Sequence, residues 1–297
     1  MKHAVVVVAL AWSSLVGAAA GSPANWTPPT DPSGLPPNWT APTGPIRLFD
    51  DVYWVGTEGL AAYLFVTDDG LILLDVGMPE NAEPVMANIR ALGHRVEEVR
   101  YLLNSHAHFD HCGGLAALKA SSGAELVASA GDRDALERGI YPGWESRTDL
   151  NFPPVDVDRV IGDGDSVTLG AVTLTAHLTP GHSPGATSWS FTARDGGQTY
   201  RALIFGSASV ALNRLAPDPQ YPGIVDDYRG TFEKMRGMTV DAYLTPHPEQ
   251  FDMAGKLARI GREAGNPFVD PTEKDRRMAE FEAAFEAALA EQQQALR

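Results

Sequence analysis

Four side chains that can ligate a metal lie within six consecutive positions, directly after an apolar segment (99–103) that is typical of a strand. They are His106, His108, Asp110 and His111. Residues two apart in an extended backbone point the same way, so His106 and His108 can share one metal ion. Asp110 and His111 then turn toward a second ion. Packing alone rarely gathers such side chains, and the alternative is a group of solvated loop histidines.

Two further histidines lie far along the chain, each in a proline-containing loop after an expected strand. His182 lies in TPGHSPG (179–185), and His247 lies in TPHP (245–248). Proline and glycine restrain such loops and present one side chain rigidly. Alone, either residue would be an ordinary loop histidine. With the first cluster they make six ligands, three for each of two metal ions, which leaves coordination positions for water and substrate.

Strand and helix patterns occur in two successive series. In the first, strand patterns cover 52–55, 61–66, 71–75, 99–103 and 125–128, and helix patterns cover 79–92, 114–120 and 131–138. In the second, strand patterns cover 167–169, 172–177, 187–192, 200–205 and 242–244, and helix patterns cover 226–235 and 252–263. This organisation predicts an α/β fold of two packed β-sheets with helices outside, whose ligand-bearing ends meet at one edge.

The last helix has a strong start signal. We expect Asp270 as its N-cap, Pro271 in its first turn and Glu273 closing a capping box. Apolar residues at helical spacing, including Met278 and Phe285, predict that one face of this helix docks on the body.

The N-terminus is typical of an export signal. Lys2 supplies a positive charge, residues 4–10 are apolar and residues 18–20 are small, so we expect cleavage after residue 20. The apolar run is too short for a convincing membrane span. Residues 21–45 form a proline-rich arm with a near-duplication, NWTPPT (25–30) and NWTAPT (38–43). We expect this arm to pack over the surface, with Trp39 reaching the rim of a cleft; the alternative is a local duplication without such a role. Residues 46–297 form a single domain, and we expect a secreted, periplasmic protein.

The net charge indicates which classes of molecule the protein can bind. A net charge of −15 argues against nucleic acid and anionic membranes, and favours a small-molecule partner.

Cys112 is the single cysteine, so no intramolecular disulfide can form. It follows His111 directly, but consecutive residues point apart, so we favour a buried apolar role over metal ligation. Nothing indicates an obligate interface, and we expect a monomer.

The motifs HAHFDH (106–111) and TPGH (179–182), together with His247, resemble the metallo-β-lactamase superfamily over nearly the whole mature chain. The resemblance implies an αβ/βα sandwich of two mixed sheets with a dinuclear site at one edge, and two Zn²⁺ per chain. It implies the following ligands: His106, His108 and His182 for the first zinc ion, and Asp110, His111 and His247 for the second.

One position distinguishes members of the superfamily. Hydroxyacylglutathione hydrolases and acyl-homoserine lactonases add a bridging aspartate after an apolar strand and a glycine, and two β-lactamase subclasses place a cysteine there. This chain has LIFGS (203–207), with Ser207 at that position. Serine with all-His/Asp ligands resembles the third metallo-β-lactamase subclass. The segments GTE (56–58), DVGMP (75–79) and NPF (266–268), and Trp189, are similar to that subclass too.

The resemblance implies hydrolysis of the β-lactam ring amide of antibiotics by a hydroxide shared between the two zinc ions, with Asp110 as the catalytic residue that orients it. Ser207 and Ser209 are candidates for binding the metal water or the substrate carboxylate, or alternatively cap the backbone at a strand end. We expect the loops 139–147 and 210–221 to wall the cleft. The alternatives are a lactonase or thioester hydrolase of the same superfamily, and a non-catalytic periplasmic zinc-binding protein.

Overall fold

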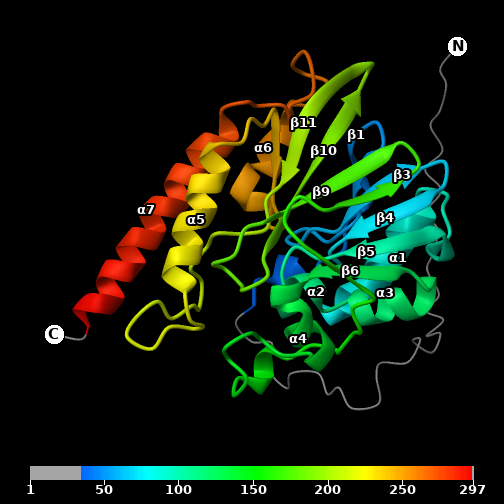
Figure 1. Ribbon diagram of the computed structural model, residues 1–297. Coiled ribbons are helices and arrows are strands. Elements are labelled where there is room, and N and C mark those ends of the chain that lie inside the picture. Colours follow the sequence, from blue (N-terminus) through cyan, green and yellow to red (C-terminus); the bar gives the residue numbers. More distant parts are fainter. Residues whose placement is uncertain (1–34, 296–297) are drawn as a thin grey trace, which may run out of the picture.

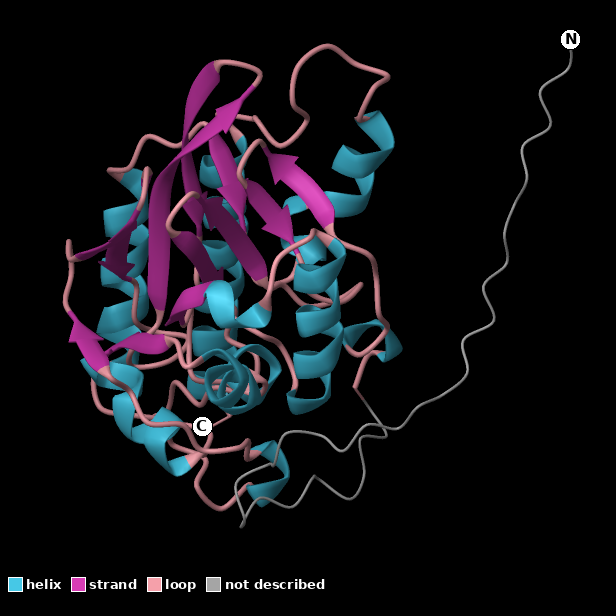
Figure 2. Cartoon of the chain, turned by 90° about the vertical axis from the view of Figure 1, so that its right-hand side faces the viewer, coloured by secondary structure: helices cyan, strands magenta, loops and turns pink. Residues whose placement is uncertain are grey.

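The computed structural model describes residues 35–295. The expected signal segment 1–20 and most of the arm lie outside the described residues. Two β-sheets pack face to face, and helices cover the outer face of each sheet (Figures 1 and 2). The α/β sandwich predicted from the sequence is therefore confirmed.

The first sheet has seven strands in sequential order. They are β1 (Ile46–Phe49), β2 (Val52–Trp54), β3 (Tyr63–Thr67), β4 (Gly70–Leu74), β5 (Val99–Leu103), β6 (Glu125–Ser129) and β7 (Arg159–Ile161). The pairs from β1 to β4 are antiparallel and those from β4 to β7 are parallel, so the sheet is mixed.

The second sheet has five strands in the order β12-β11-β10-β9-β8. They are β8 (Ser166–Leu169), β9 (Val172–Leu178), β10 (Thr187–Asp195), β11 (Gln198–Ile204) and β12 (Ala242–Leu244). Strands β8 to β11 pair antiparallel, and β12 pairs parallel to β11, so this sheet is mixed as well.

Seven α-helices surround the sheets in the described part of the chain. They are α1 (Ala82–Ala91), α2 (Phe109–Cys112), α3 (Leu115–Ser122), α4 (Ala130–Arg138), α5 (Ile224–Arg236), α6 (Met253–Arg259) and α7 (Glu273–Gln294). Short 3₁₀ helices are η1 (Pro37–Trp39), η2 (Pro79–Asn81), η3 (Val96–Glu98), η4 (Thr148–Leu150) and η5 (Pro248–Phe251). None of the described helices is long and apolar enough to cross a membrane.

The alternation of side chains along β4 shows how the sandwich is built. Ile72 and Leu74 belong to the cluster between the two sheets, while Leu71 and Leu73 belong to the cluster beneath α1 and α3. All four side chains are fully buried. Because successive strand residues point to opposite faces, a continuously apolar strand is stable only with a layer on each side.

The helices on the second sheet pack through aromatic side chains. Phe285 of α7 lies 4.8 Å from Tyr228 and 5.8 Å from Phe232 of α5, measured between ring centroids. Figure 1 shows these two helices side by side, outside the second sheet. The apolar face predicted for the last helix thus docks on the body.

The start of α7 differs from the prediction. Thr272 is the N-cap, and the Asp270 Oδ1 accepts hydrogen bonds from the Thr272 N–H and Oγ1–H instead of capping the helix. Glu273 does not close a capping box, since its side chain is buried and paired with Lys256. A buried lysine ammonium needs a partner of opposite charge. The contact with Lys256 therefore outweighs the local capping pattern.

Two further elements differ from the sequence pattern. The helix expected over 252–263 ends at Arg259, since Ile260 (φ −55°, ψ 126°) leaves the helical conformation and Gly261 (φ +71°) follows with a left-handed backbone. A short helix, α2, lies inside the cluster of candidate ligands, where no helix was expected. The described part of the arm packs on the body, with Asn88 Nδ2 donating to the Thr43 carbonyl at 2.9 Å.

Candidate metal centre

The six candidate ligands lie in segments that follow the ends of three strands. β5 leads to residues 106–111, β9 to the loop with His182, and β12 to the loop with His247. β9, β11 and β12 run in the same direction, because β10 is antiparallel to both β9 and β11. Their carboxyl ends therefore lie at one edge of the second sheet, where they meet residues 106–111 of the first half.

The first group consists of His106, His108 and His182, whose ligand nitrogens all lie within 4.8 Å of one another. The Nε2 atoms of His106 and His182 are 3.2 Å apart, and His108 Nε2 is buried with no hydrogen-bond partner among the described residues. Converging buried nitrogen lone pairs without hydrogen-bond donors are costly, and a cation between them satisfies these lone pairs. The group therefore fits a metal ion.

The second group consists of Asp110, His111 and His247. The Asp110 Oδ2 lies 3.2 Å from His111 Nε2 and 3.5 Å from His247 Nε2. One carboxylate and two imidazoles form a donor set that suits zinc and similar divalent metals. The sequence-predicted ligands are thus gathered as two adjacent groups of three.

The short helix α2 separates the two groups. His108 is its N-cap with extended backbone (φ −111°, ψ 147°), and Asp110 and His111 lie on the helical turn that follows. The change from extended to helical backbone gives Asp110 and His111 another orientation, and with His247 they form the second group. One short motif therefore supplies ligands to both groups.

Burial controls the protonation of the ligands. It lowers the pKa of His106 and His108 well below the usual range, of His182 to about 4 and of His247 to about 3. These imidazoles are neutral near pH 7, which is the form that binds metals.

Asp110 and His111 behave as a pair. Burial opposes both charged forms, but the neighbouring histidines hold the pKa of Asp110 far below its usual range. In turn, the Asp110 charge and its hydrogen bond raise the pKa of His111 in spite of burial. The second group therefore contains an ionised carboxylate that carries charge complementary to a cation.

A backbone carbonyl orients His182. Its Nδ1 lies 2.7 Å from the carbonyl oxygen of Ser209, which can only accept, so Nδ1 carries the proton and Nε2 is left for a metal. The Tyr228 hydroxyl donates to the same oxygen at 2.8 Å. The loop after β11 thus fixes the orientation of a ligand on the loop after β9.

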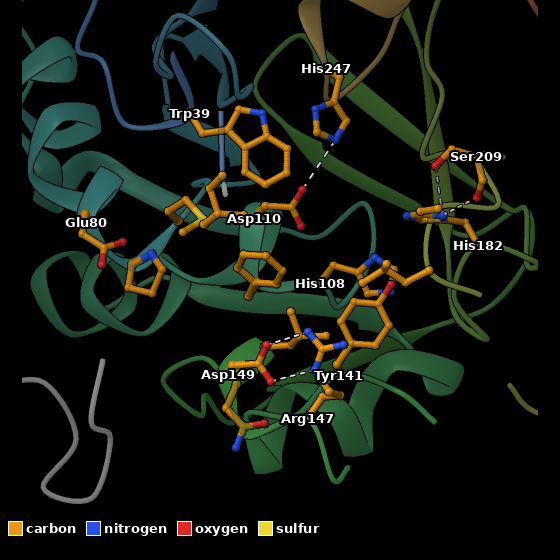
Figure 3. A pocket seen from close by; sticks show the side chains of 18 residues that line it. Trp39, Glu80, His108, Asp110, Tyr141, Arg147, Asp149, His182, Ser209 and His247 are labelled. Atoms are coloured by element: carbon orange, nitrogen blue, oxygen red, sulfur yellow. Dashed lines mark hydrogen bonds and ion pairs between the residues drawn. The ribbon is translucent and has the colours of Figure 1, made fainter. Parts of the chain in front are cut away.

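A cavity of about 470 Å³ opens beside the two groups. Figure 3 shows His108, Asp110, His182 and His247 around it, with the Arg147–Asp149 ion pair at its far wall. The remaining lining is mostly apolar: Leu35, Trp39, Met78, Pro79, Phe109, Tyr141, Leu150, Ala211 and Leu212, with Glu80, Asn151 and Ser209.

Two aromatic side chains of the cavity wall touch candidate ligands. Tyr141 stacks on His108, with ring centroids 3.9 Å apart and planes 12° from parallel. The ring centroids of Trp39 and His247 lie 5.5 Å apart, so the arm reaches the rim of the cavity as expected. The sequence predicts the loop 139–147 at the cleft but does not distinguish Tyr141 within it. No local signal distinguishes it, because its contact depends on the approach of two separate loops.

The remaining candidates are placed as follows. Ser209 lines the cavity, whereas Ser207 is buried behind it and contacts the Ser209 Oγ at 3.3 Å. Cys112 is fully buried in the apolar cluster of the first sheet, with its sulfur donating to the His108 carbonyl. It belongs to neither ligand group.

Residues 56–247 match the family model described as "Metallo-beta-lactamase superfamily". A solved structure, BJP-1, a subclass B3 metallo-beta-lactamase of Bradyrhizobium japonicum, is 48% identical in sequence. The TM-score is 0.85, and the match covers 88% of this chain and 99% of that chain.

Two curated proteins match shorter parts. Hydroxyacylglutathione hydrolase of Rhodospirillum rubrum is 34% identical over 38% of this chain and 36% of its own length. N-acyl homoserine lactonase of Bacillus cereus is 29% identical over 41% of this chain and 54% of its own length. The chain spans about half or less of these relatives. With the family model covering most of the described domain, the chain belongs to the metallo-beta-lactamase superfamily, in which it is similar to a subclass B3 structure over nearly that protein's full length.

Proposed function

We propose that this protein is a zinc-dependent hydrolase that opens the ring amide of β-lactams. The observation that carries the proposal is the pair of adjacent three-ligand groups beside a largely apolar cavity, in a chain 48% identical to a subclass B3 metallo-beta-lactamase. Ser207 supports a β-lactam substrate, because hydroxyacylglutathione hydrolases and acyl-homoserine lactonases are expected to carry an aspartate at that position.

The two groups would hold one zinc ion each. Bound zinc would supply Lewis acidity and lower the pKa of coordinated water to roughly 7. The ionised carboxylate of Asp110 lies in the cavity wall and can orient a water molecule by accepting a hydrogen bond from it. Ser209 lines the same cavity, and its hydroxyl can donate to a carboxylate of the substrate.

The cavity suits a small anionic molecule with apolar substituents. Trp39, Tyr141 and Leu212 offer apolar surface on which such substituents can pack. Two bound divalent cations with one ligand carboxylate would make the centre positively charged, although the whole chain is strongly acidic. This local charge would attract the substrate carboxylate.

Hydrolysis of a lactone or a thioester is the second candidate. It is favoured by the curated relatives, which are named as a hydroxyacylglutathione hydrolase and a lactonase. These reactions use the same six ligands, and Ser207 in place of the expected bridging aspartate tells against them. A comparison of substrates distinguishes the two candidates. A non-catalytic zinc-binding role fits less well, because each group offers three ligands beside an accessible cavity, whereas structural zinc sites are closed.

The test compares three substrates with one purified protein. In zinc-containing buffer we expect rapid hydrolysis of a chromogenic cephalosporin, and slower hydrolysis of an acyl-homoserine lactone and of a glutathione thioester. A chelator should abolish the activity and added zinc should restore it. Preference for the lactone or the thioester would replace the leading proposal with the second, and turnover insensitive to the chelator would exclude the metal-dependent mechanism.

We further propose that the protein acts in the periplasm as a monomer and contributes to β-lactam antibiotic resistance. The export-type segment at residues 1–20 supports this location. Expression of the full chain in a susceptible bacterium should raise the β-lactam concentration needed to stop growth. Light scattering on the purified protein would measure its oligomeric state.

A further inference from the structure

Asp132 is a fully buried carboxylate that the proposed reaction does not use. It lies in the first turn of α4 and is completely shielded from solvent. Its neighbour on the same helix, Asp134, is exposed and paired with Arg138. No described lysine or arginine pairs with Asp132, so its charge is balanced by hydrogen bonds alone. A buried carboxylate without a cation is costly unless several donors satisfy it.

Three donors surround this carboxylate. The Oδ2 accepts the Ala107 N–H at 2.8 Å and the Ser183 hydroxyl at 3.0 Å. The Oδ1 accepts the Gly185 N–H at 2.9 Å. Hydrogen bonds to an ionised acceptor are roughly twice as strong as those between neutral groups. Asp132 is therefore a firm anchor for two separate loops.

The anchored loops carry the first ligand group. Ala107 lies between His106 and His108, while Ser183 directly follows His182. One carboxylate thus connects the ligand loop of the first half to the ligand loop of the second half.

Glycine allows the helix and the loop to approach closely. A Cβ at Gly131 would lie 2.5 Å from the Pro184 carbonyl oxygen, and a Cβ at Gly185 would lie 2.3 Å from the Asp132 nitrogen. Real Cβ atoms do not approach so closely. The Ser129 hydroxyl adds a hydrogen bond to the Gly185 carbonyl at 2.6 Å. The start of α4 therefore packs directly against the loop that carries His182.

We propose that Asp132 is a positioning residue that sets the spacing of His106, His108 and His182, and thereby the affinity of the first metal site. The inference rests on the metal-binding role proposed above. Ala107 and Ser183 are direct neighbours of the first-group ligands, whereas among the described residues the carboxylate makes no hydrogen bond to the loop that carries His247, so the second site depends on it less. Removing the anchor should weaken the first metal site more than the second.

The variant Asp132→Asn tests this directly. The asparagine amide keeps one acceptor oxygen, but its NH₂ group can only donate. This NH₂ group must face either the Gly185 N–H or the Ala107 N–H and the Ser183 hydroxyl. At least one loop is then released. We expect zinc affinity to fall by roughly 10-fold or more at one site, as for other residues that support metal ligands.

Zinc titration against a chromogenic chelator measures both binding steps on metal-free protein. The cobalt absorption spectrum identifies the affected site by comparison with His182→Asn, which removes a ligand of the first group, and His247→Asn, which removes one of the second. The spectrum of cobalt-loaded Asp132→Asn should match that of His182→Asn. The control is Asp158→Asn, since Asp158 Oδ2 also accepts a backbone N–H, from Leu126 at 2.8 Å, but lies away from both groups.

The outcomes are distinct. Unchanged affinity in Asp132→Asn, equal weakening of both sites, or a match to His247→Asn would overturn the inference. If Asp132→Asn does not fold, Ser183→Ala, which removes one of the three hydrogen bonds, decides by the same readout: selective weakening supports the role and unchanged affinity overturns it. Wild-type protein that binds no metal would overturn both proposals. Wild-type protein that binds two ions but hydrolyses no β-lactam would overturn the proposed function alone.

Discussion

Tyr141 covers one face of His108 in a nearly parallel stack, with ring centroids 3.9 Å apart. The tyrosine belongs to a loop of the cavity wall, and the histidine is a candidate ligand of the first metal site. The stack restricts rotation of the imidazole and shields it from water. A side chain of the substrate cavity thereby also supports the geometry of the metal centre.

Loss of this stack should reduce catalysis moderately. Stacked aromatic pairs contribute about 0.5–1.5 kcal/mol, so we expect kcat/KM for a cephalosporin to fall about 2- to 10-fold in Tyr141→Leu. Tyr141→Phe keeps the ring and should retain wild-type kcat/KM. Steady-state kinetics on both variants measure this, and equal losses in the two would show that the hydroxyl, not the stack, is responsible.

Removal of a single ligand should have a much larger effect than removal of a nearby histidine. We expect His182→Asn to lose one bound zinc ion per chain and at least about 100-fold in hydrolysis. His177 lies on β9, before the loop that carries His182, and its Nε2 bonds to the Ser190 hydroxyl outside both groups, so His177→Asn is the matched control. Metal analysis and cephalosporin turnover give the result. A similar loss in both variants would contradict the assignment of His182.

The metal-free protein should lose stability as the pH falls from about 6.5 toward 4. Unfolded histidine binds a proton near pH 6.5, whereas burial holds the folded-state pKa of four ligand histidines lower. In this range the unfolded state binds more protons, which favours unfolding. Each such histidine can cost about 1.4 kcal/mol per pH unit. These histidines are His106, His108, His182 and His247.

Two buried carboxyl groups act in the opposite direction. Burial raises the pKa of Asp75 and of Asp132 to about 6, so between about 6 and 4 the folded state holds protons that the unfolded state has lost. The raised pKa of His111 acts in the same direction as these carboxyls between pH 7.5 and 6.5. Four histidines outweigh these three groups, and the net effect remains destabilising. Urea denaturation of chelator-treated protein at pH 7.5 and 5.5 measures it. Equal or higher stability at pH 5.5 would refute the prediction.

The buried pair of Lys256 and Glu273 should be costly to break. Both side chains are almost completely shielded from solvent. Lys256→Met leaves the buried Glu273 carboxylate without its closest partner, with Arg276 still 3.7 Å away, and we expect a loss of about 3 kcal/mol in the free energy of unfolding. The double variant Lys256→Met/Glu273→Leu removes both charges and should regain most of this loss. Urea denaturation of the three proteins is the measurement, and a double variant no more stable than the single one would count against the explanation.

Export predicts a defined N-terminus for the mature protein. Cleavage after residue 20 makes Gly21 the first residue. Full-length protein expressed in a Gram-negative host should appear in the periplasmic fraction, and N-terminal sequencing should begin at or within a few residues of Gly21. Intact protein in the cytoplasmic fraction would contradict the proposed location.

Much of the fold followed from local periodicity. β5 and β12 have the predicted bounds, because continuous apolar runs of strand length need burial on both faces. Motif spacing alone identified the six candidate ligands, since histidine and aspartate are placed by short loops directly after strands. The predicted start of α7 was wrong because the Glu273 carboxylate pairs with the buried Lys256 instead of capping its own helix.

The sequence by itself therefore determined the layered α/β architecture and the chemistry of the metal groups, because both depend on residue type and on spacing within short segments. Only the tertiary structure decided which side chains support those groups. Asp132 is separated from Ser183 by 51 positions, yet the two are in contact, and Tyr141 reaches His108 from another loop. In sequence, Asp132 resembles any charged residue of a surface helix. Its burial and its three donors arise only where the two halves of the sandwich meet.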